Sequence, residues 1–360
     1  MSDTPRIRFS GYTDAWEQRK FQDIINVCSG RDYKHLEEGN VPVYGTGGYM
    51  LSVSEALSEK EDAIGIGRKG TIDKPYILKA PFWTVDTLFY CIPKQYYDLN
   101  FAFNLFQNVD WKLKDESTGV PSLSKQAINS VETFVPSYEE QSKIGEYFSS
   151  LDHAITLHQR KSDEMKELKK YMLQKMFPKP NATVPEIRFE GYTDAWEQRK
   201  LGKVLQTLPF KPYLATPEQD GEYEIIQQGN QPIIGYANGK PCEEYKDIVV
   251  FGDHTLSLYK PKSPFFVATD GVRILKGIDS MNGDYLNALL EKYKPQSEGY
   301  KRYYSILSDC ECKFTTDKDE QSRIGNYFAS LDTAITLHQR KCDELKELKK
   351  YMLQNMFPKQ

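Results

Sequence analysis

Two long stretches of the sequence repeat their apolar residues in alternating steps of four and three. The first begins after Pro136 and ends at Phe177-Pro178, and the second ends at Phe357-Pro358. Such spacing predicts a helix whose apolar face packs along another helix, as in a coiled coil. A helix of about 38 residues would be roughly 57 Å long, too long to lie inside one lobe. The predicted seam consists of Ile144, Phe148, Leu151, Ile155, Met165 and Leu168 in the first helix, and of Ile324, Phe328, Leu331, Ile335, Leu345 and Leu348 in the second.

Both helices carry boundary signals. Ser137 with Glu140, and Asp317 with Glu320, have the spacing of a capping box, and a proline ends each helix. His158 and His338 fall on the seam, where we expect them to be packed rather than to act as ligands or catalysts. Because two such helices in one chain can pair, we predict an antiparallel pair with a lobe at each end, related by a pseudo-twofold axis.

Outside these helices the pattern changes to short apolar runs bounded by turns, which predicts strands. In the first lobe the runs are 41–44, 63–66, 76–78 and 82–92, followed by a helical pattern at 96–106. In the second lobe they are 223–226, 233–236, 248–251 and 265–275, followed by a helical pattern at 285–293. Since the order of elements is the same, we predict two lobes that share one α+β fold.

The chain also repeats itself letter for letter in places. Residues 11–20 and 191–200 both read GYTDAWEQRK, and residues 140–179 differ from residues 320–359 at only seven positions, a period of 180 residues. Between these constant pieces the halves have little identity. Uniform drift would spread the differences evenly, so we favour a fixed scaffold that carries two lobes of different specificity. The expected domains are a first lobe at 1–137, a helix at 138–178, a linker and second lobe at 179–317, and a helix at 318–360.

Composition excludes some classes of protein. The 360 residues have a net charge of −4, which argues against a free-standing basic DNA binder but leaves room for a local basic patch. The sequence has no run of 18 apolar residues, and residues 1–9 lack the apolar core of a secretory signal, so no membrane association is expected. The six cysteines lack paired CxxC spacing, so we expect free thiols, no metal site and a cytoplasmic protein.

The first lobe contains a glycine-rich segment, residues 65–70, that matches the pattern GxGxxG. A dinucleotide site requires a helix to begin there, but Pro75 follows closely, and a P-loop would require lysine at the position of Thr71. We interpret the segment as a turn that offers DNA contacts, because arginine can bond the O6 and N7 atoms of guanine. The candidate residues are Arg68, Lys69, Gly70, Thr71 and Lys74, with a second turn at Gly45, Thr46 and Gly47 that could equally be a plain tight turn.

The second lobe has different side chains at the corresponding place, Asp253, His254 and Thr255. These residue types invite comparison with a catalytic triad, but no GxSxG serine accompanies them. We therefore treat them as the counterpart of the first turn and as candidates for DNA contact.

Two further segments of the second lobe are candidates. Gln227, Gln228 and Asn230 are amides that could pair with adenine, or could belong to an exposed polar loop. Lys301, Arg302 and Tyr303 lie in a run that interleaves basic and aromatic residues, which favours backbone contact and stacking on DNA over packing in the core.

Motifs for DNA-modifying chemistry are missing from the sequence. We find no Asn/Asp-Pro-Pro-Tyr/Phe motif of an amino-methyltransferase, no Walker motif and no convincing carboxylate–lysine cluster of a nuclease. Glu167 and Lys169 repeat as Glu347 and Lys349 within the constant helices, so we assign them to the scaffold. The sequence therefore predicts a non-catalytic chain that holds no metal and no cofactor.

These segments together resemble the specificity subunits of type I restriction–modification systems, the HsdS family, along essentially the whole chain. The resemblance rests on GYTDAWEQRK, on EEQSKIGEYFSSLDHAITLHQRK and its copy, on IGIGRKGTIDKPY followed by FWTVDTLFY, and on VVFGDHT followed by FVATDGVRIL. It implies that each lobe is a target recognition domain that reads one half of a bipartite double-stranded DNA target, with the coiled coil setting the spacer. It also implies partners, namely two methylation subunits that use S-adenosylmethionine to modify adenine, and restriction subunits that use ATP and Mg²⁺.

A different class of protein remains as the alternative, a coiled-coil interaction scaffold whose two lobes bind no DNA. Salt dependence would separate the two, because a lobe that neutralises phosphates loses affinity steeply as salt is added. The missing catalytic motifs disfavour a third class, a self-sufficient DNA-modifying enzyme.

Overall fold

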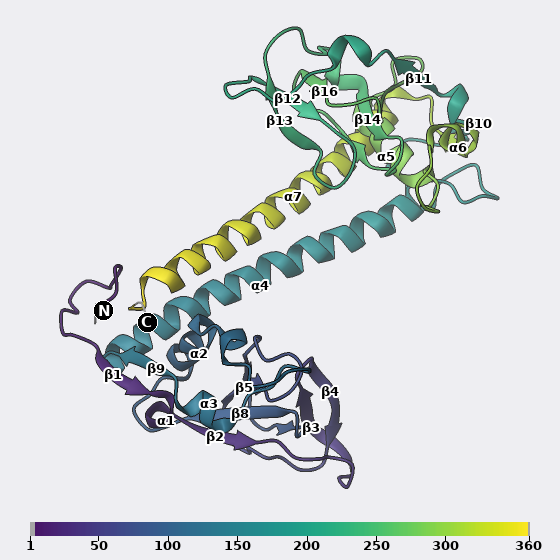
Figure 1. The fold of residues 1–360 in the computed structure, drawn as a ribbon. Coiled ribbons are helices and arrows are strands. Elements are labelled where there is room, and N and C mark those ends of the chain that lie inside the picture. The colour runs from purple at the N-terminus through teal and green to yellow at the C-terminus, as the bar shows by residue number, and fades with distance from the viewer. Residues whose placement is uncertain (1–3, 359–360) are drawn as a thin grey trace. The chain divides into compact units, whose positions relative to one another are not determined.

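The computed structural model describes residues 4–358, and the chain divides into two compact units. Unit 1 comprises residues 1–158 and 340–360, and unit 2 comprises residues 159–339. Each unit therefore combines one lobe with part of both long helices, and Figure 1 shows both lobes as mixtures of short strands and helices. The predicted α+β class is confirmed.

Unit 1 contains three small sheets. One has four antiparallel strands in the order β2-β8-β5-β6, another has the order β4-β3-β7 with β3 and β7 parallel, and β1 pairs with β9. The elements are β1 (Glu17–Lys20), α1 (Phe21–Ile24), β2 (Ile25–Ser29), β3 (Glu38–Gly45), β4 (Gly48–Val53), β5 (Ala63–Gly67), β6 (Tyr76–Leu78), β7 (Trp83–Thr84), β8 (Leu88–Pro93), α2 (Leu99–Asn108), the 3₁₀ helix η1 (Trp111–Lys114), α3 (Lys125–Asn129), β9 (Glu132–Val135) and α4 (Tyr138–Lys175).

Unit 2 repeats this arrangement of strands. Its sheets have the orders β11-β17-β14-β15 and β13-β12-β16, and β10 pairs with β18. The elements are β10 (Glu197–Lys200), η2 (Leu201–Lys203), β11 (Leu205–Leu208), η3 (Lys211–Tyr213), β12 (Tyr223–Ile226), β13 (Ile233–Ala237), η4 (Tyr245–Asp247), β14 (Ile248–Gly252), β15 (Leu258–Tyr259), β16 (Phe265–Val267), β17 (Val272–Gly277), α5 (Gly283–Tyr293), α6 (Tyr304–Asp309), β18 (Glu311–Phe314) and α7 (Lys318–Asn355).

The two longest predicted strands are each divided in the structure. Residues 85–87 form a turn between β7 and β8, and residues 268–271 form a turn between β16 and β17. In both lobes the first part joins the three-stranded sheet and the second part joins the four-stranded sheet. Both parts are largely buried, so the run of apolar letters continues across the turn and hides it.

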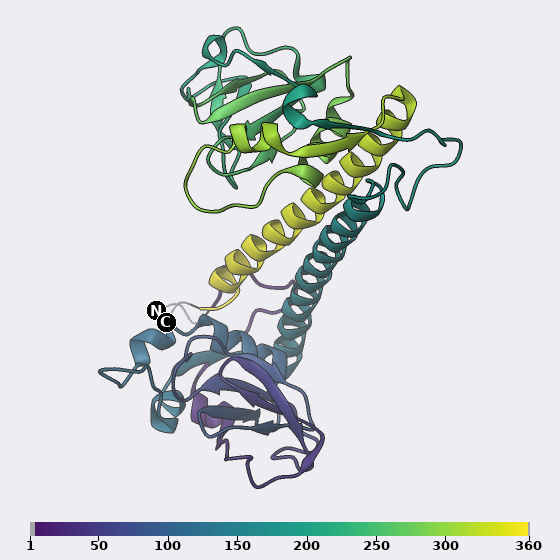
Figure 2. The same ribbon diagram turned by 90° about the vertical axis from the view of Figure 1, so that its right-hand side faces the viewer.

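The helices α4 and α7 run antiparallel within each unit. In unit 1 the Lys349 ammonium lies 2.6 Å from the Asp152 carboxylate, and in unit 2 Lys169 lies 2.6 Å from Asp332. Residue numbers thus fall along one helix as they rise along the other. Figures 1 and 2 show the end of α7 beside the first half of α4 and the start of α7 beside the second half.

The predicted seam is wrong at two positions. Leu168 and Leu348 are 43% and 41% exposed, and the next residues, Lys169 and Lys349, turn toward the partner helix instead. The other predicted seam residues are buried or half-buried. The predicted seam reached Met165 and then Leu168 by two successive steps of three residues. Along a helix a step of three has to be followed by a step of four if the seam is to stay on one face. A lysine fits the seam because its apolar stem is buried while its ammonium meets a carboxylate.

Each long helix begins with the predicted N-cap residue, but the carboxylates of Glu140 and Glu320 bond to arginines of the segment before each lobe. The Ser137 hydroxyl accepts from the Glu140 amide at 3.4 Å, and the Asp317 carboxylate accepts from the Glu320 amide at 2.8 Å. The buried Glu140 carboxylate accepts two bonds from Arg8 at 2.7 and 2.8 Å, and Glu320 accepts two from Arg188 at 2.7 and 2.9 Å. These bidentate pairs fasten the segment before each lobe to the helix that follows it.

Each lobe lies against its long helix at a glycine. A Cβ atom on Gly145 would come within 2.3 Å of the Asp98 carboxylate, and one on Gly325 within 2.6 Å of the Asn282 side-chain oxygen. Asp98 and Asn282 cap the N-termini of α2 and α5. The missing side chain thus lets the cap of the lobe helix approach the long helix directly.

Aromatic side chains form the junction between lobe and helices in both units. In unit 1 Phe357 stacks on Phe101 with ring centroids 5.6 Å apart, and in unit 2 Phe177 stacks on Tyr285 at 6.1 Å. The phenylalanine just after each long helix also packs near the start of the other, against Phe148 in unit 1 and Phe328 in unit 2. Among the described residues, no helix is both long and apolar enough to cross a membrane.

Candidate nucleic-acid interface

Three connecting segments meet in the first lobe. We name them the hairpin tip (residues 45–48), the central turn (68–71) and the outer loop (109–124). The Gly70 amide donates to the Pro121 carbonyl at 2.8 Å, and the Leu123 amide donates to the Arg68 carbonyl at 3.0 Å, which joins the central turn to the outer loop. A Cβ on Gly70 would lie 3.9 Å from the Thr46 hydroxyl, so the hairpin tip adjoins the same turn.

The central turn presents its basic side chains to solvent. Arg68, Lys69 and Lys74 are exposed, whereas Thr71 is half-buried. The Arg68 guanidinium lies 5.9 Å from the centroid of the Phe89 ring and 3.5 Å from the Asp86 carbonyl, contacts that orient it without covering it. Gly70 has φ +88°, which a glycine adopts at little cost. Strand β6 follows this turn, so its glycine-rich letters open no dinucleotide-binding helix.

The hairpin tip is less accessible than the turn. Gly45 is buried, and its carbonyl accepts a hydrogen bond from the Tyr76 hydroxyl at 2.6 Å. Thr46 is half-buried and Gly47 is exposed. Of the three candidates in this segment, Thr46 and Gly47 are the ones that a ligand could reach.

The outer loop of the first lobe was missed in the sequence analysis. It exposes Leu113 by 81% and Val120 by 66%, and Lys112 and Lys114 flank Leu113. The Asp115 carboxylate braces the loop by accepting from the amides of Ser122 and Ser117 at 2.9 and 3.0 Å, and these bonds lower its pKa. The sequence did contain a signal for an exposed loop here, because a lysine lies on each side of Leu113 and Gly119 and Pro121 follow.

The same three segments meet in the second lobe. Here the hairpin tip is residues 227–232, the central turn is 253–256 and the outer loop is 294–303. The Tyr303 amide donates to the Asp253 carbonyl at 2.7 Å, and this bond matches the one from Leu123 to Arg68. The His254 amide donates to the Gln228 side-chain oxygen at 3.0 Å, so the hairpin tip also adjoins the turn.

Two candidates in the second lobe are buried, which contradicts their predicted contact with DNA. Asp253 is 1% exposed and accepts from Arg273 at 3.1 and 3.2 Å and from the Tyr304 amide at 2.9 Å. Tyr303 is equally buried, and its hydroxyl accepts from the Glu298 amide at 2.6 Å and donates to the Gly299 carbonyl at 2.7 Å. Both side chains brace the loops from inside, because a buried carboxylate or phenol needs such partners.

The neighbouring candidates keep accessible groups. Thr255 is exposed, as is Arg302, whose guanidinium lies 3.9 Å from the Asp270 carboxylate. Lys301 pairs with Glu298 at 2.6 Å. His254 is half-buried, and its ring stacks on that of Tyr300 with centroids 4.7 Å apart and planes within 4°.

The amides of the second hairpin tip differ in accessibility. Gln227 donates to the Gln231 carbonyl at 2.9 Å, and Gln228 is held by the central turn. Asn230 is exposed at the tip. Asn230 is therefore the amide best placed to meet a base edge, while the two glutamines shape the loop.

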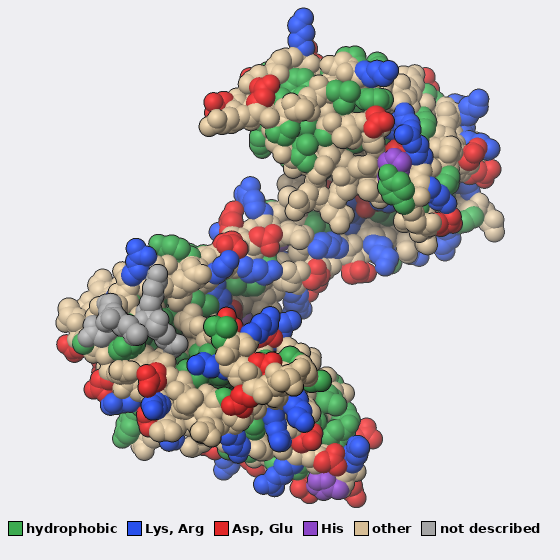
Figure 3. All heavy atoms as spheres, in the orientation of Figure 1, with side chains coloured by type: hydrophobic (Ala, Val, Ile, Leu, Met, Phe, Trp, Pro, Cys, Tyr) green, Lys and Arg blue, Asp and Glu red, His purple; other side chains and the backbone are tan. Residues whose placement is uncertain are grey.

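Charge does not gather into a single patch on the face shown. Figure 3 shows Lys and Arg side chains interspersed with Asp and Glu over both lobes and the helices. Within residues 4–358, no group of three or more His, Cys, Asp and Glu side chains is arranged to hold a metal.

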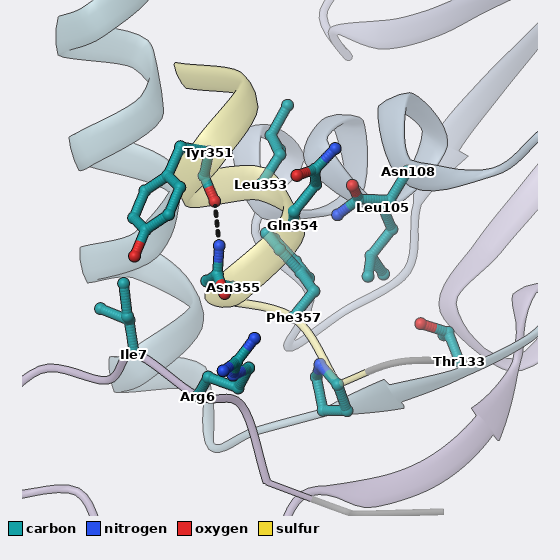
Figure 4. A pocket seen from close by; sticks show the side chains of 11 residues that line it. Arg6, Ile7, Leu105, Asn108, Thr133, Tyr351, Leu353, Gln354, Asn355 and Phe357 are labelled. Carbon is teal, nitrogen blue, oxygen red and sulfur yellow. Dashed lines mark hydrogen bonds between the residues drawn. The ribbon is translucent and has the colours of Figure 1, made fainter. Parts of the chain in front are cut away.

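A cavity of about 820 Å³ lies elsewhere in unit 1, where the segment before β1 meets the end of α7. Figure 4 shows Arg6, Ile7, Asn108, Thr133 and Asn355 around it, and these residues lie outside the three loops. In unit 2 Lys313 takes the place that Phe134 has in the pairing of β1 with β9, and its ammonium bonds the carbonyls of Lys179 and Ala182 at 2.9 and 2.6 Å. The linker that follows α4 is thus fastened in unit 2 by a lysine that unit 1 lacks at that place.

Comparison with known proteins adds a family to this geometry. A family model described as "Type I restriction modification DNA specificity domain" matches residues 13–167. The S subunit of a type I restriction–modification system from M. genitalium has a similar crystal structure, with a TM-score of 0.78 at 14% identity over 99% of this chain and 100% of that chain. The HsdS subunit of Thermoanaerobacter tengcongensis aligns over 99% of both chains at 16% identity, but its TM-score of 0.38 carries no argument. No curated protein matches the sequence.

Proposed function

We propose that the chain, whose residues 13–167 match the family model of the type I restriction modification DNA specificity domain, belongs to that family and binds a bipartite double-stranded DNA target. One observation carries the proposal. The same three loops meet in both lobes, and an equivalent main-chain bond joins the central turn to the outer loop in each, yet their side chains differ. Fixed loops with variable side chains suit two readers of two base sequences.

The accessible side chains divide between the two halves of the target. In the first lobe Arg68, Lys69 and Lys74 would contact bases and phosphates, with Thr46 and Thr71 nearby. In the second lobe the contacts would come from Asn230, Thr255 and Arg302. The helices α4 and α7, which lie within the expected helical domains 138–178 and 318–360, would set the length of the spacer between the half-sites.

The chain would direct chemistry that other subunits perform. Two methylation subunits would bind S-adenosylmethionine and modify adenine, and restriction subunits would use ATP and Mg²⁺. Each unit supplies one docking face, because leucine and tyrosine side chains on the same flank of both helices are exposed. This face comprises Leu157, Leu348 and Tyr351 in unit 1, and Leu337, Leu168 and Tyr171 in unit 2.

The positions of these side chains support a shared docking face. Each precedes a seam position by one residue, which places all three on one side of an antiparallel pair. Exposed apolar clusters of this kind mark protein interaction sites. Two copies of the face match two methylation subunits.

A pull-down tests the docking face. The double variant Leu168→Glu/Leu348→Glu should no longer retain the methylation subunit, whereas Val184→Glu, an equally exposed position in the linker, should retain it. Full retention of the partner by the double variant would show that the face has another role.

A methylome tests the function as a whole. The chain would be co-expressed with the methylation subunit encoded beside it, in a host without adenine methylation, and modified adenines would be mapped by single-molecule sequencing. We expect a two-part motif with a fixed gap, of which only one half changes when residues 1–137 are exchanged for another lobe. An assembled complex that methylates no new site, with a methylation subunit that works with another specificity chain, would favour the interaction scaffold instead.

A further inference from the structure

The outer loop of the second lobe is held in one conformation. The Tyr303 hydroxyl bonds the backbone at Glu298 and Gly299, and the Tyr303 amide bonds the Asp253 carbonyl. Gly299 adopts φ +96°, which turns the chain between these bonds. Residue 300 therefore projects from a braced turn rather than from a loose strand.

Tyr300 is the most exposed large apolar side chain described in the second lobe, at 88%. One face of its ring stacks on His254, with centroids 4.7 Å apart and planes within 4°. The His254 ring is oriented in turn, because its Nδ1 lies 3.2 Å from the Lys301 carbonyl. Among the described residues no other ring packs against Tyr300, so its second face is kept in the open.

Two basic residues follow this ring in the chain. Lys301 and the exposed Arg302 come directly after Tyr300, and the exposed Thr255 comes directly after His254 in the central turn. A flat aromatic surface next to cationic side chains suits a nucleic acid, which offers base faces and phosphates together.

The first lobe differs at this point. Its outer loop projects Leu113, an aliphatic side chain between Lys112 and Lys114, and no aromatic ring in that loop is exposed among the described residues. Aliphatic side chains fill space between bases, whereas aromatic rings also stack on a base face. The two half-sites should thus meet different kinds of contact.

We propose that Tyr300 stacks on the face of a base in the second half-site, with the His254 ring as the fixed layer behind it. The inference rests on the proposed DNA-binding function and adds an affinity contact at Tyr300, next to the predicted candidates Lys301 and Arg302. Stacking tolerates changes of base identity, so Tyr300 contributes affinity and register more than discrimination.

An abasic scan of the mapped target tests the contact. Each nucleotide of the second half-site is replaced in turn by an abasic analogue, and the affinity of the assembled complex with the methylation subunits is measured. We expect one position where loss of the base weakens binding of the unaltered protein by about 5- to 150-fold, the range of one aromatic stack. In Tyr300→Ala the intact target binds that much more weakly, and the abasic penalty at this position disappears.

Two further variants separate stacking from other contacts. Tyr300→Phe keeps the ring and should keep the penalty, whereas Tyr300→Leu keeps only apolar bulk and should lose it. Tyr96→Ala, an exposed tyrosine of unit 1 outside the three loops, should leave the scan unchanged. The first half-site serves as an internal control in every variant.

The outcomes distinguish the inference from the function on which it rests. A complex that binds no specific target overturns the proposed function. Specific binding in which Tyr300→Ala keeps every abasic penalty overturns the stacking contact alone. Loss of the penalty in Tyr300→Phe would assign the contact to the hydroxyl and would equally overturn stacking.

Discussion

Arg68 and Asp253 occupy the same place in the two lobes and have opposite surroundings. The amide of each donates across the turn, to Thr87 at 2.8 Å and to Gly271 at 2.9 Å, and the carbonyl of each accepts from the outer loop. Yet Arg68 is exposed, whereas Asp253 is 1% exposed and bonded to Arg273. The main chain of this turn is therefore constant, and its side chain can either face a ligand or support the loops.

The outer loops show the same independence of main chain and side chain. In the first lobe a carboxylate, Asp115, collects the loop amides, and in the second lobe a phenol, Tyr303, does so. Equivalent loops are thus braced by different chemistry. Equivalent positions in the two lobes can therefore have different roles.

The largest expected effect comes from removing the support in the second lobe. Asp253→Ala leaves Arg273 and the Tyr304 amide without their acceptor, and should lower the free energy of unfolding by roughly 3 kcal/mol. Arg68→Ala, at the equivalent exposed position, should change it by less than about 0.5 kcal/mol. Denaturant unfolding of the two full-length variants measures both. Equal losses would show that the two positions are used alike.

The second expectation concerns reading rather than stability. If Arg68 bonds a base edge, Arg68→Ala should relax one position of the first half-site, at about 1–3 kcal/mol of discrimination, and leave the second half-site unchanged. Methylation of a randomised target library by the assembled complex measures this. A motif that is unaltered at every position would rule out base reading by Arg68.

A third variant tests the brace in the second outer loop. Tyr303→Phe removes two hydrogen bonds to the loop backbone and should cost about 1–2 kcal/mol of stability. Affinity for the second half-site should fall with it, because Tyr300 loses its fixed position. Tyr300→Phe, the same chemical change on the same loop, should be neutral. Hydrogen exchange at the Glu298 amide reports directly whether the loop has opened.

The smallest expected difference lies in the helix seam. Lys169 meets two carboxylates in unit 2, Asp332 at 2.6 Å and Glu291, while Lys349 in unit 1 meets Asp152. Burial lowers the pKa of Lys169, but the two carboxylates outweigh it and the pKa lies above its usual value. Lys169→Met should therefore destabilise the protein by about 1 kcal/mol more than Lys349→Met in denaturant unfolding near neutral pH. The reverse order would indicate that desolvation dominates this pair.

Some of these features could be predicted from the sequence. The near-identical helices and the common order of strands gave the α+β fold, because periodicity and turns are local properties. Strands β1 and β10 could not be found, since every residue of Glu-Gln-Arg-Lys is exposed and no alternation remains. Their partners, β9 and β18, lie more than a hundred residues away in the chain.

The candidate interface was predictable only in outline. Its central turns follow from glycines and basic letters, but the burial of Asp253 depends on Arg273, which comes from strand β17. Nothing in the letters Asp-His-Thr distinguishes a side chain that faces the strand from one that faces solvent. The outer loop of the first lobe was missed for a related reason, because the bonds that bring it to Arg68 join residues more than fifty positions apart.

The two arginine–glutamate pairs at the starts of α4 and α7 have a consequence for how this chain can change by recombination. Arg8 with Glu140 and Arg188 with Glu320 enclose stretches of equal length, each containing one whole lobe. The amino-acid sequence around each pair is repeated, so a recombination event there would exchange a lobe together with both ends of its fastening. A recombinant chain would inherit new loops on an unchanged anchor, and the loops of one lobe could change in a single event while both arginine–glutamate pairs persist.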